Sequence, residues 1–134
     1  MKKILKNQRG LTLIELLAVI VILGIIAAIA VPSIGNIIEN SRDKAVVTEA
    51  IQIIDAAKIA RAGNPDQDTF TFTGGEEGSV ALEDYLDKVK DKEFTVTHTD
   101  SGFTIKDHEA NNKVTGVTEG VLLETELIDY IDGN

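Results

Sequence analysis

The hydrophobic positions of this 134-residue chain follow two different patterns. The first is an apolar run of 21 residues, 11–31, in which Glu15 is the single charge. An α-helix of that length spans roughly 31 Å, close to the hydrocarbon thickness of a bilayer, and it satisfies its own backbone hydrogen bonds in lipid. This run predicts a membrane-spanning helix that begins near Leu11.

The second pattern follows Pro32 and is amphipathic. Apolar residues recur at three- and four-residue steps and charged residues occupy much of the other side, which indicates a helix with one apolar stripe. Gly63 and Pro65 supply a stop signal. The stripe consists of Val46, Val47, Ala50, Ile51, Ile53, Ile54, Ala57 and Ala60. We therefore predict one helix over residues 11–62, whose second half needs a sheet to cover its stripe.

The rest of the chain alternates apolar and polar residues between turn signals, as strands do. The segments are residues 69–73, 93–99, a turn at 100–102, 103–105, a turn at 111–112, and 114–117. They predict a three-stranded antiparallel meander. Ser79 is placed to cap a short helix over residues 79–89, and residues 121–131 also fit a helix. The predicted fold class is α+β, a long N-terminal helix packed on a small antiparallel sheet.

Composition restricts the function. The chain contains no cysteine, so its stability comes from packing without disulfides. Its formal charge is −9, which becomes −13 without the four cations of the first ten residues, Lys2, Lys3, Lys6 and Arg9. An acidic body repels phosphate backbones, so we expect no direct nucleic-acid binding. The basic N-terminus in front of an apolar run predicts that this end stays cytoplasmic and that the body is exported.

An ordinary secretory signal peptide is the alternative to a membrane helix. Its apolar core is usually about 7–15 residues and ends at small residues, and residues 27–30 offer such a site. We disfavour it because the apolar run is longer and continues into the amphipathic helix.

Glu15 is unusual, because an acid within an apolar span costs about 2.5–3.5 kcal/mol at the bilayer centre, less near its ends, and usually marks function. The simpler interpretation is local: Thr12 and Glu15 are spaced as a capping box, and an acid in the first turn complements the helix dipole.

Residues 8–17 (QRGLTLIELL) resemble the processing site of type IV prepilins and pseudopilins. The resemblance implies that a prepilin peptidase cuts between Gly10 and Leu11 and that Leu11 is then N-methylated, although Phe is commonest at that position. It also implies that Glu15, five residues into the mature chain, neutralises the Leu11 amine of a neighbouring subunit during assembly.

Gly24, Pro32 and Gly35 follow the spacing of glycine and proline in the same family. The resemblance makes residues 24–32 a candidate for local helix melting in a packed fibre. A plain membrane-helix kink at Pro32 is the alternative, since proline cannot donate to the carbonyl of Ala28.

The resemblance further implies three regions: a leader removed from residues 1–10, a membrane and filament-core half-helix over 11–35, and a soluble head over 36–134. The implied partners are further copies of the chain in a homopolymeric filament, the prepilin peptidase, the pilus assembly platform with its ATPase, and the membrane before assembly. The implied location is first the cell membrane and then an extracellular filament.

Other candidate sites are weak. Asn64, Asp66 and Asp68 alternate like the start of a calcium loop, but Pro65 intrudes and the required Gly and Glu are missing. We expect a solvated turn there, and a mobile loop around Glu76 and Glu77. His98 and His108 lack zinc-ligand spacing, which favours ordinary surface or strand-edge histidines. We find no catalytic motif, and therefore expect no metal, no cofactor and no enzyme activity.

The predicted function is thus a structural subunit of a type IV pilus. A pseudopilin of a secretion or competence system shares the same N-terminal segment, and a membrane-tethered binding module is the alternative from another class. The body lacks a calcium loop and paired C-terminal cysteines, which favours a cysteine-free pilus subunit and a Gram-positive source.

Overall fold

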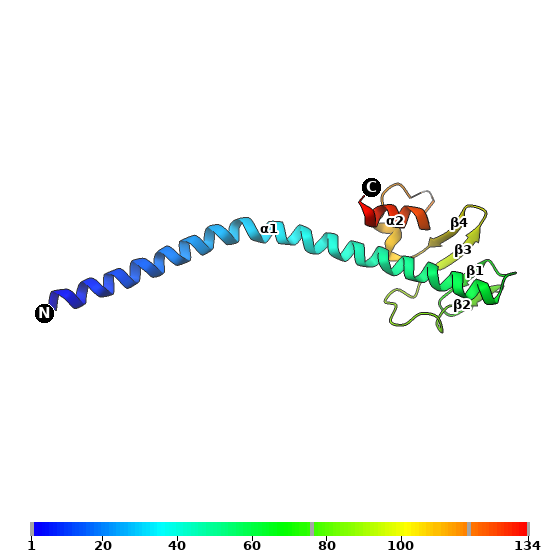
Figure 1. The fold of residues 1–134 in the computed structure, drawn as a ribbon, viewed down its shortest axis with the longest axis horizontal. Coiled ribbons are helices and arrows are strands. Elements are labelled where there is room, and N and C mark those ends of the chain that lie inside the picture. Colours follow the sequence, from blue (N-terminus) through cyan, green and yellow to red (C-terminus); the bar gives the residue numbers. More distant parts are fainter. Residues whose placement is uncertain (1, 76, 118, 134) are drawn as a thin grey trace. The chain divides into compact units, whose positions relative to one another are not determined.

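The computed structural model describes residues 2–75, 77–117 and 119–133, with side chains from Gly10 onward. The chain divides into two compact units, Met1–Asn40 and Ser41–Asn134. Helix α1 (Lys2–Gly63) runs through both. The remaining elements, all in the second unit, are β1 (Thr69–Thr71), β2 (Ser79–Ala81), β3 (Thr95–Thr99), β4 (Gly102–Lys106), the 3₁₀ helix η1 (Glu109–Asn112), β5 (Val121–Leu123) and α2 (Glu124–Asp132) (Figure 1).

The second half of α1 buries the stripe that the sequence predicts. Six of its side chains are completely buried: Val47, Ala50, Ile53, Ile54, Ala57 and Ala60. The predicted end of the helix is also confirmed, since α1 ends at Gly63. The backbone N–H and the side-chain Nδ2 of Asn64 both donate to the carbonyl of Ala60, at 3.1 and 3.0 Å, and so satisfy a carbonyl of the last turn.

The sheet has five strands in the order β2-β1-β3-β4-β5. The α+β class is confirmed, and β1, β3 and β4 are antiparallel as predicted. The prediction of a purely antiparallel three-stranded sheet is wrong, because β2 adds a parallel strand beside β1 and β5 adds an antiparallel strand beside β4.

The predicted helix over residues 79–89 is wrong. Residues 79–81 pair with β1 instead, and the pairing continues where Leu82 N–H donates to Thr71 O and Glu83 N–H to Phe72 O. Lys88 has a φ of +59°, which an α-helix does not allow. Pairing with a distant strand thus outweighs the local capping signal of Ser79.

Two predictions near the C-terminus also need correction. Residues 114–117 form a turn rather than a strand, because η1 precedes them and Gly116 adopts a left-handed φ of +91°. Residues 121–123 form β5, so the predicted helix over 121–131 is confirmed only from Glu124 onward. That helix starts where Leu123 N–H donates to the Glu126 carboxylate at 2.8 Å.

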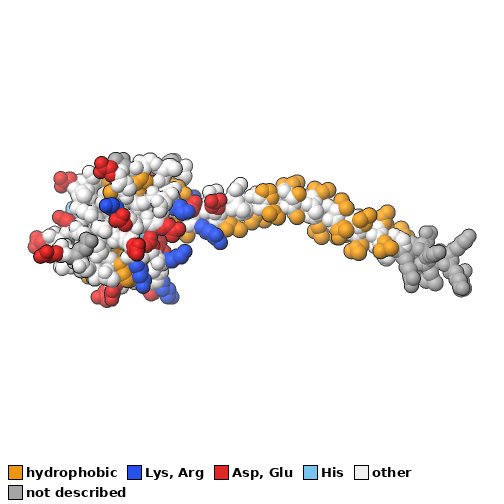
Figure 2. Space-filling view, turned by 180° about the vertical axis from the view of Figure 1, so that it is seen from behind, with side chains coloured by type: hydrophobic (Ala, Val, Ile, Leu, Met, Phe, Trp, Pro, Cys, Tyr) orange, Lys and Arg blue, Asp and Glu red, His pale blue; other side chains and the backbone are white. Residues whose placement is uncertain are grey.

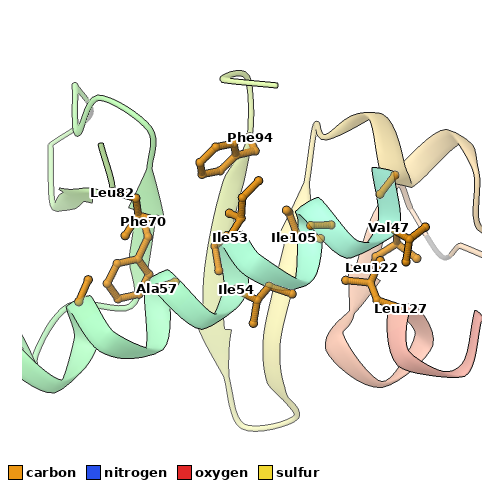
Figure 3. Packing of buried hydrophobic residues seen from close by; sticks show 14 residues of the cluster. Val47, Ile53, Ile54, Ala57, Phe70, Leu82, Phe94, Ile105, Leu122 and Leu127 are labelled. Carbon is orange, nitrogen blue, oxygen red and sulfur yellow. The ribbon is translucent and has the colours of Figure 1, made fainter. Parts of the chain in front are cut away.

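The core of the second unit lies between α1 and one face of the sheet (Figure 3). Alternate strand residues point toward the helix, and Val47 of α1 lies beside Leu122 and Leu127. The buried strand residues are Phe70, Val96, Ile105 and Leu122. Helix α2 adds Leu127 to the same core, so this face of the sheet is covered by helices.

Candidate processing and assembly segment

The residues of the predicted processing site all lie within α1. Gly10, Leu11 and Glu15 are exposed, and the helix passes through them without a break. Inside a helix the amide N–H of Leu11 is directed along the helix axis toward the preceding turn. An amine would exist at this position only if the Gly10–Leu11 bond were cut.

A cut after Gly10 would change the electrostatics of this end of the helix. The new N-terminus would carry an ammonium group next to four backbone N–H groups without helical partners, so positive charge would be concentrated there. Glu15 lies four residues from Leu11 and hence on the same helix face. Because helical side chains lean toward the N-terminus, the carboxylate of Glu15 is directed toward the end that carries the new charge.

The capping interpretation of Thr12 does not hold for the uncut chain. Helix α1 is already formed at Lys2, so Thr12 and Glu15 lie inside the helix rather than at its start. A capping box requires the backbone before its first residue to be non-helical.

The first unit presents an apolar surface to its surroundings. Large apolar side chains from Leu11 to Ile38 are between 48% and 71% exposed. This helix is long and apolar enough to cross a membrane, and its most apolar window has no buried residue. Figure 2 shows hydrophobic side chains over much of this part of the helix, whereas charged side chains gather on the second unit. Burial of each such side chain stabilises by about 1.5–3 kcal/mol, so water is a poor solvent for this segment.

Gly24, Pro32 and Gly35 also lie within the unbroken helix. A Cβ added at either glycine would meet no atom within 4 Å. Packing within the chain therefore does not require glycine at these positions. Each glycine lowers helix stability by about 1 kcal/mol relative to alanine, and Pro32 removes one helical hydrogen bond.

Two residues of the possible calcium loop, Asn64 and Asp68, make contacts with other residues of the protein. The Asp68 carboxylate oxygen Oδ1 lies 3.3 Å from Arg61 Nε and 3.3 Å from His98 Nδ1. Asn64 is used at the end of α1, and Asp66 is exposed. Within the described residues, no group of three or more His, Asp or Glu side chains is arranged to hold a metal ion.

The two histidines differ from each other. His98 is half-buried on β3 and packs edge-on against Phe103, with ring centroids 4.8 Å apart. His108 is only 2% exposed, so the prediction of a surface or strand-edge histidine is wrong for this residue. Its Nδ1 accepts a hydrogen bond from Ala110 N–H at 3.1 Å and caps η1.

A polar cluster missed by the sequence analysis surrounds His108. Because Nδ1 accepts a hydrogen bond, the neutral ring carries its proton on Nε2, which lies 3.5 Å from Glu49 Oε1 and has no hydrogen-bond partner. Asn111 accepts from His108 N–H and donates to the carbonyls of Ile105 and Gly120. The only local signal is an Asn three residues after a His, which matches a capping box.

Comparison with known families agrees with this geometry. Residues 5–31 match the family model of the prokaryotic N-terminal methylation motif. The motif on a long apolar helix, followed in the chain by a small α+β unit, supports assignment of the chain to the type IV pilin family.

The relatives are named fimbrial proteins. The chain is 38% identical over 78 residues to the type IV major fimbrial protein FimA of Dichelobacter nodosus, covering 58% of this chain and 46% of the relative. It is 40% identical over 80 residues to fimbrial protein Q of Moraxella bovis, covering 51% of each. A further FimA of D. nodosus is 32% identical over 103 residues, covering 71% of this chain and 60% of the relative. The chain thus spans about half the length of the curated relatives it matches. No solved structure matches the chain significantly.

Proposed function

We propose that this protein is a structural subunit of a type IV pilus, cut between Gly10 and Leu11, N-methylated on Leu11, and polymerised through α1. The observation that carries this proposal is that α1 bears the methylation motif over residues 5–31 and exposes its large apolar side chains from Leu11 to Ile38. Such a segment needs lipid before assembly and the helices of other subunits afterwards.

The proposed assembly contact joins the Leu11 ammonium of one subunit to Glu15 of its neighbour. Both charges lie in apolar surroundings, where an isolated charge is expensive and a pair much less so. The pair would fix the axial register of helices whose other surface residues are similar all along their length.

The remaining parts of the proposal follow from the family. Residues 1–10 are a leader, 11–35 the membrane and filament-core half-helix, and 36–134 the head. The partners are the prepilin peptidase, further copies of the chain, and an assembly platform with its ATPase. The protein lies in the membrane before assembly and in a surface filament afterwards, and it has no catalytic activity of its own.

Intact-mass measurement of the protein from membranes and from sheared filaments tests the proposal. We expect the filament form to lack residues 1–10 and to carry one added methyl group. A filament subunit that retains these residues would contradict the proposal. A chain that stays uncut in the membrane and forms no filament would indicate a membrane-tethered binding module instead.

A further inference from the structure

His108 lies where α1, the segment before β3 and the turn after β4 meet. Its side chain is completely buried, and its ring packs edge-on against Phe94, with ring centroids 6.5 Å apart. Nε2 lies 3.5 Å from Oε1 of Glu49 on α1. Nδ1 accepts the hydrogen bond from Ala110 N–H that caps η1. One buried ring thus connects the long helix to the capped turn, through two nitrogens in different roles.

The capped turn is also connected to strands β4 and β5. Asn111 accepts from His108 N–H at 3.1 Å, which completes a reciprocal capping box. Asn111 Nδ2 donates to the carbonyl of Ile105 in β4 and to that of Gly120 just before β5, at 3.1 and 2.8 Å. Because the two halves of a capping box support each other, loss of the His108 cap would weaken this connection between the strands.

The charged side chains that face His108 are acids. Glu49 faces it from α1, and the cavity beside His108 is lined by four further acids, Asp91, Glu93, Asp107 and Glu109. The described cations near these segments are directed elsewhere: Lys92 lies over the Phe72 ring, Lys113 contacts Asp43 at 2.9 Å, and Lys106 is exposed. The acids therefore attract positive charge to this site.

We propose that His108 is a pH-operated switch, which caps η1 when neutral and, when protonated, releases this cap and pairs with Glu49. Histidine is the side chain that ordinarily gains a proton between pH 5 and 8. The added proton enters at Nδ1, because Nε2 already carries one, and the charged ring has two donors and no acceptor. Nδ1–H and Ala110 N–H are then both donors, so the cap is lost. Nε2–H gains a charge-assisted partner in the Glu49 carboxylate.

Acid favours the released turn, because this form binds one more proton than the capped turn. The capped turn excludes a proton from Nδ1, whereas the released turn accepts it. Linkage then requires that release is promoted as the pH falls and that the cap is restored as the pH rises. Carboxyl groups ordinarily titrate below this range of pH, so a response between pH 5 and 8 points to a histidine.

Amide hydrogen exchange of the full-length protein in nonionic detergent, at about pH 8 and about pH 5, tests the switch. Ala110 N–H donates to the His108 ring, and Lys113 N–H closes the same turn on Ala110 O at 2.9 Å. We expect their protection factors to fall at least about fivefold at the lower pH, the loss expected for one hydrogen bond. Leu82 N–H, which donates to Thr71 O beside the opposite edge strand β2, should keep its protection.

Three variants assign the response to its residues. His108→Asn offers an oxygen as a cap but cannot titrate, so its protection factors should not depend on pH, even if the turn is less stable throughout. His98→Asn makes the same change at the other histidine and should respond like the wild type. Glu49→Gln removes the charge that faces Nε2 and keeps an oxygen for Asp91 N–H, which donates to Glu49 Oε1 at 3.0 Å. Release should then require a lower pH.

Equal protection of the wild type at both pH values, or a pH response that persists in His108→Asn, would overturn the proposal. Release of Glu49→Gln at an unchanged pH would overturn the pairing with Glu49. Should His108→Asn fail to fold, the NMR shifts of the ring nitrogens of wild-type His108 decide. An Nδ1 that is still an unprotonated acceptor at about pH 5 would contradict the switch.

Discussion

At the scale of single residues, Glu15 is the least expected side chain of the exposed apolar segment. It has no acid or base beside it in the apolar run, and only apolar residues and Thr12 surround it in the sequence from Leu11 to Val31. Carboxylates at such positions are usually retained for function, because they weaken insertion into lipid. In the proposed assembly contact, a partner that appears only after the chain is cut would account for its presence.

Glu15→Ala should leave membrane insertion intact and abolish filament formation. The substitution makes the apolar segment more hydrophobic, so insertion improves by about 2–3 kcal/mol or less, whereas the ammonium of the neighbouring subunit loses its counter-charge. Membrane fractionation and electron microscopy of sheared cells measure the two effects. Glu39→Ala changes an acid outside the apolar run and serves as a control. Normal filaments from Glu15→Ala would disprove the pairing role.

At the scale of elements, periodicity predicted α1 well and the sheet incompletely. The stripe of α1 repeats over several turns, so its pattern is strong and local. Strand β2 has only three residues, and its pairing with Phe70 and its neighbours depends on a contact that no local pattern encodes. For the same reason the helix predicted from Ser79 failed. His108 was misplaced because its burial depends on Glu49 and Phe94, which are far from it in the sequence.

The candidate site was more predictable than the sheet. Gly10, Leu11 and Glu15 belong to one short motif, and their relation within a helix follows from sequence spacing alone. The alignment of Ser79, Thr69, Thr97 and Thr104 across four strands was not predicted, although the alternation of residues 69–73 and 93–99 was evident. This row exists only once the strands are aligned in register, and register is set by contacts across the sheet.

Lys58 joins α1 to α2 through a short ion pair with Glu124, and it also contacts Asp55 at 3.2 Å. Partial burial lowers the pKa of Lys58, but the hydrogen bonds and charges of Glu124 and Asp55 outweigh this effect and raise the pKa above its ordinary value. A raised pKa in the folded state stabilises the protein below the unfolded-state pKa, and this stabilisation is lost as the pH rises through the folded-state pKa.

Lys58→Met should therefore destabilise the second unit slightly at neutral pH, by about 1 kcal/mol or less because the side chain is partly exposed. The difference from the wild type should shrink above about pH 10.4, where the lysine begins to lose its proton. Thermal unfolding of the full chain in detergent between pH 7 and 11.5 measures this. Lys106→Met removes an exposed lysine with no ion pair in the described structure. An equal effect of both variants would show that the pair contributes nothing specific.

At the scale of the whole molecule, the exposed apolar surface and the buried hydrophobic core belong to different parts of the chain. The large apolar side chains left exposed lie mainly between Leu11 and Ile38, and the buried core belongs to Ser41–Asn134. In a filament, the first unit would carry the contacts between subunits and the mechanical load. Gly24 and Pro32 are then the weakest points of the loaded helix, because each lowers helix stability, Gly24 has open space where a Cβ would lie, and Pro32 is exposed.

Gly24→Ala combined with Pro32→Ala should give filaments that extend less under force. The two changes together stabilise the helix by about 4 kcal/mol, so melting of residues 24–32 requires a higher load. Force–extension measurements on single filaments test this, with Ala27→Leu as a helix-compatible control. Unchanged extension of filaments made of the double variant would show that segments other than residues 24–32 let the filament extend.

The complete hydrophobic core of Ser41–Asn134 has a consequence for the life of such a filament. A head that folds on its own residues needs no donated strand from a neighbour, so joining and leaving the polymer changes only what surrounds the apolar helix. A subunit that leaves a shrinking filament would therefore return to the lipid with its head still folded. The same protein molecules could then be used again in the next round of growth.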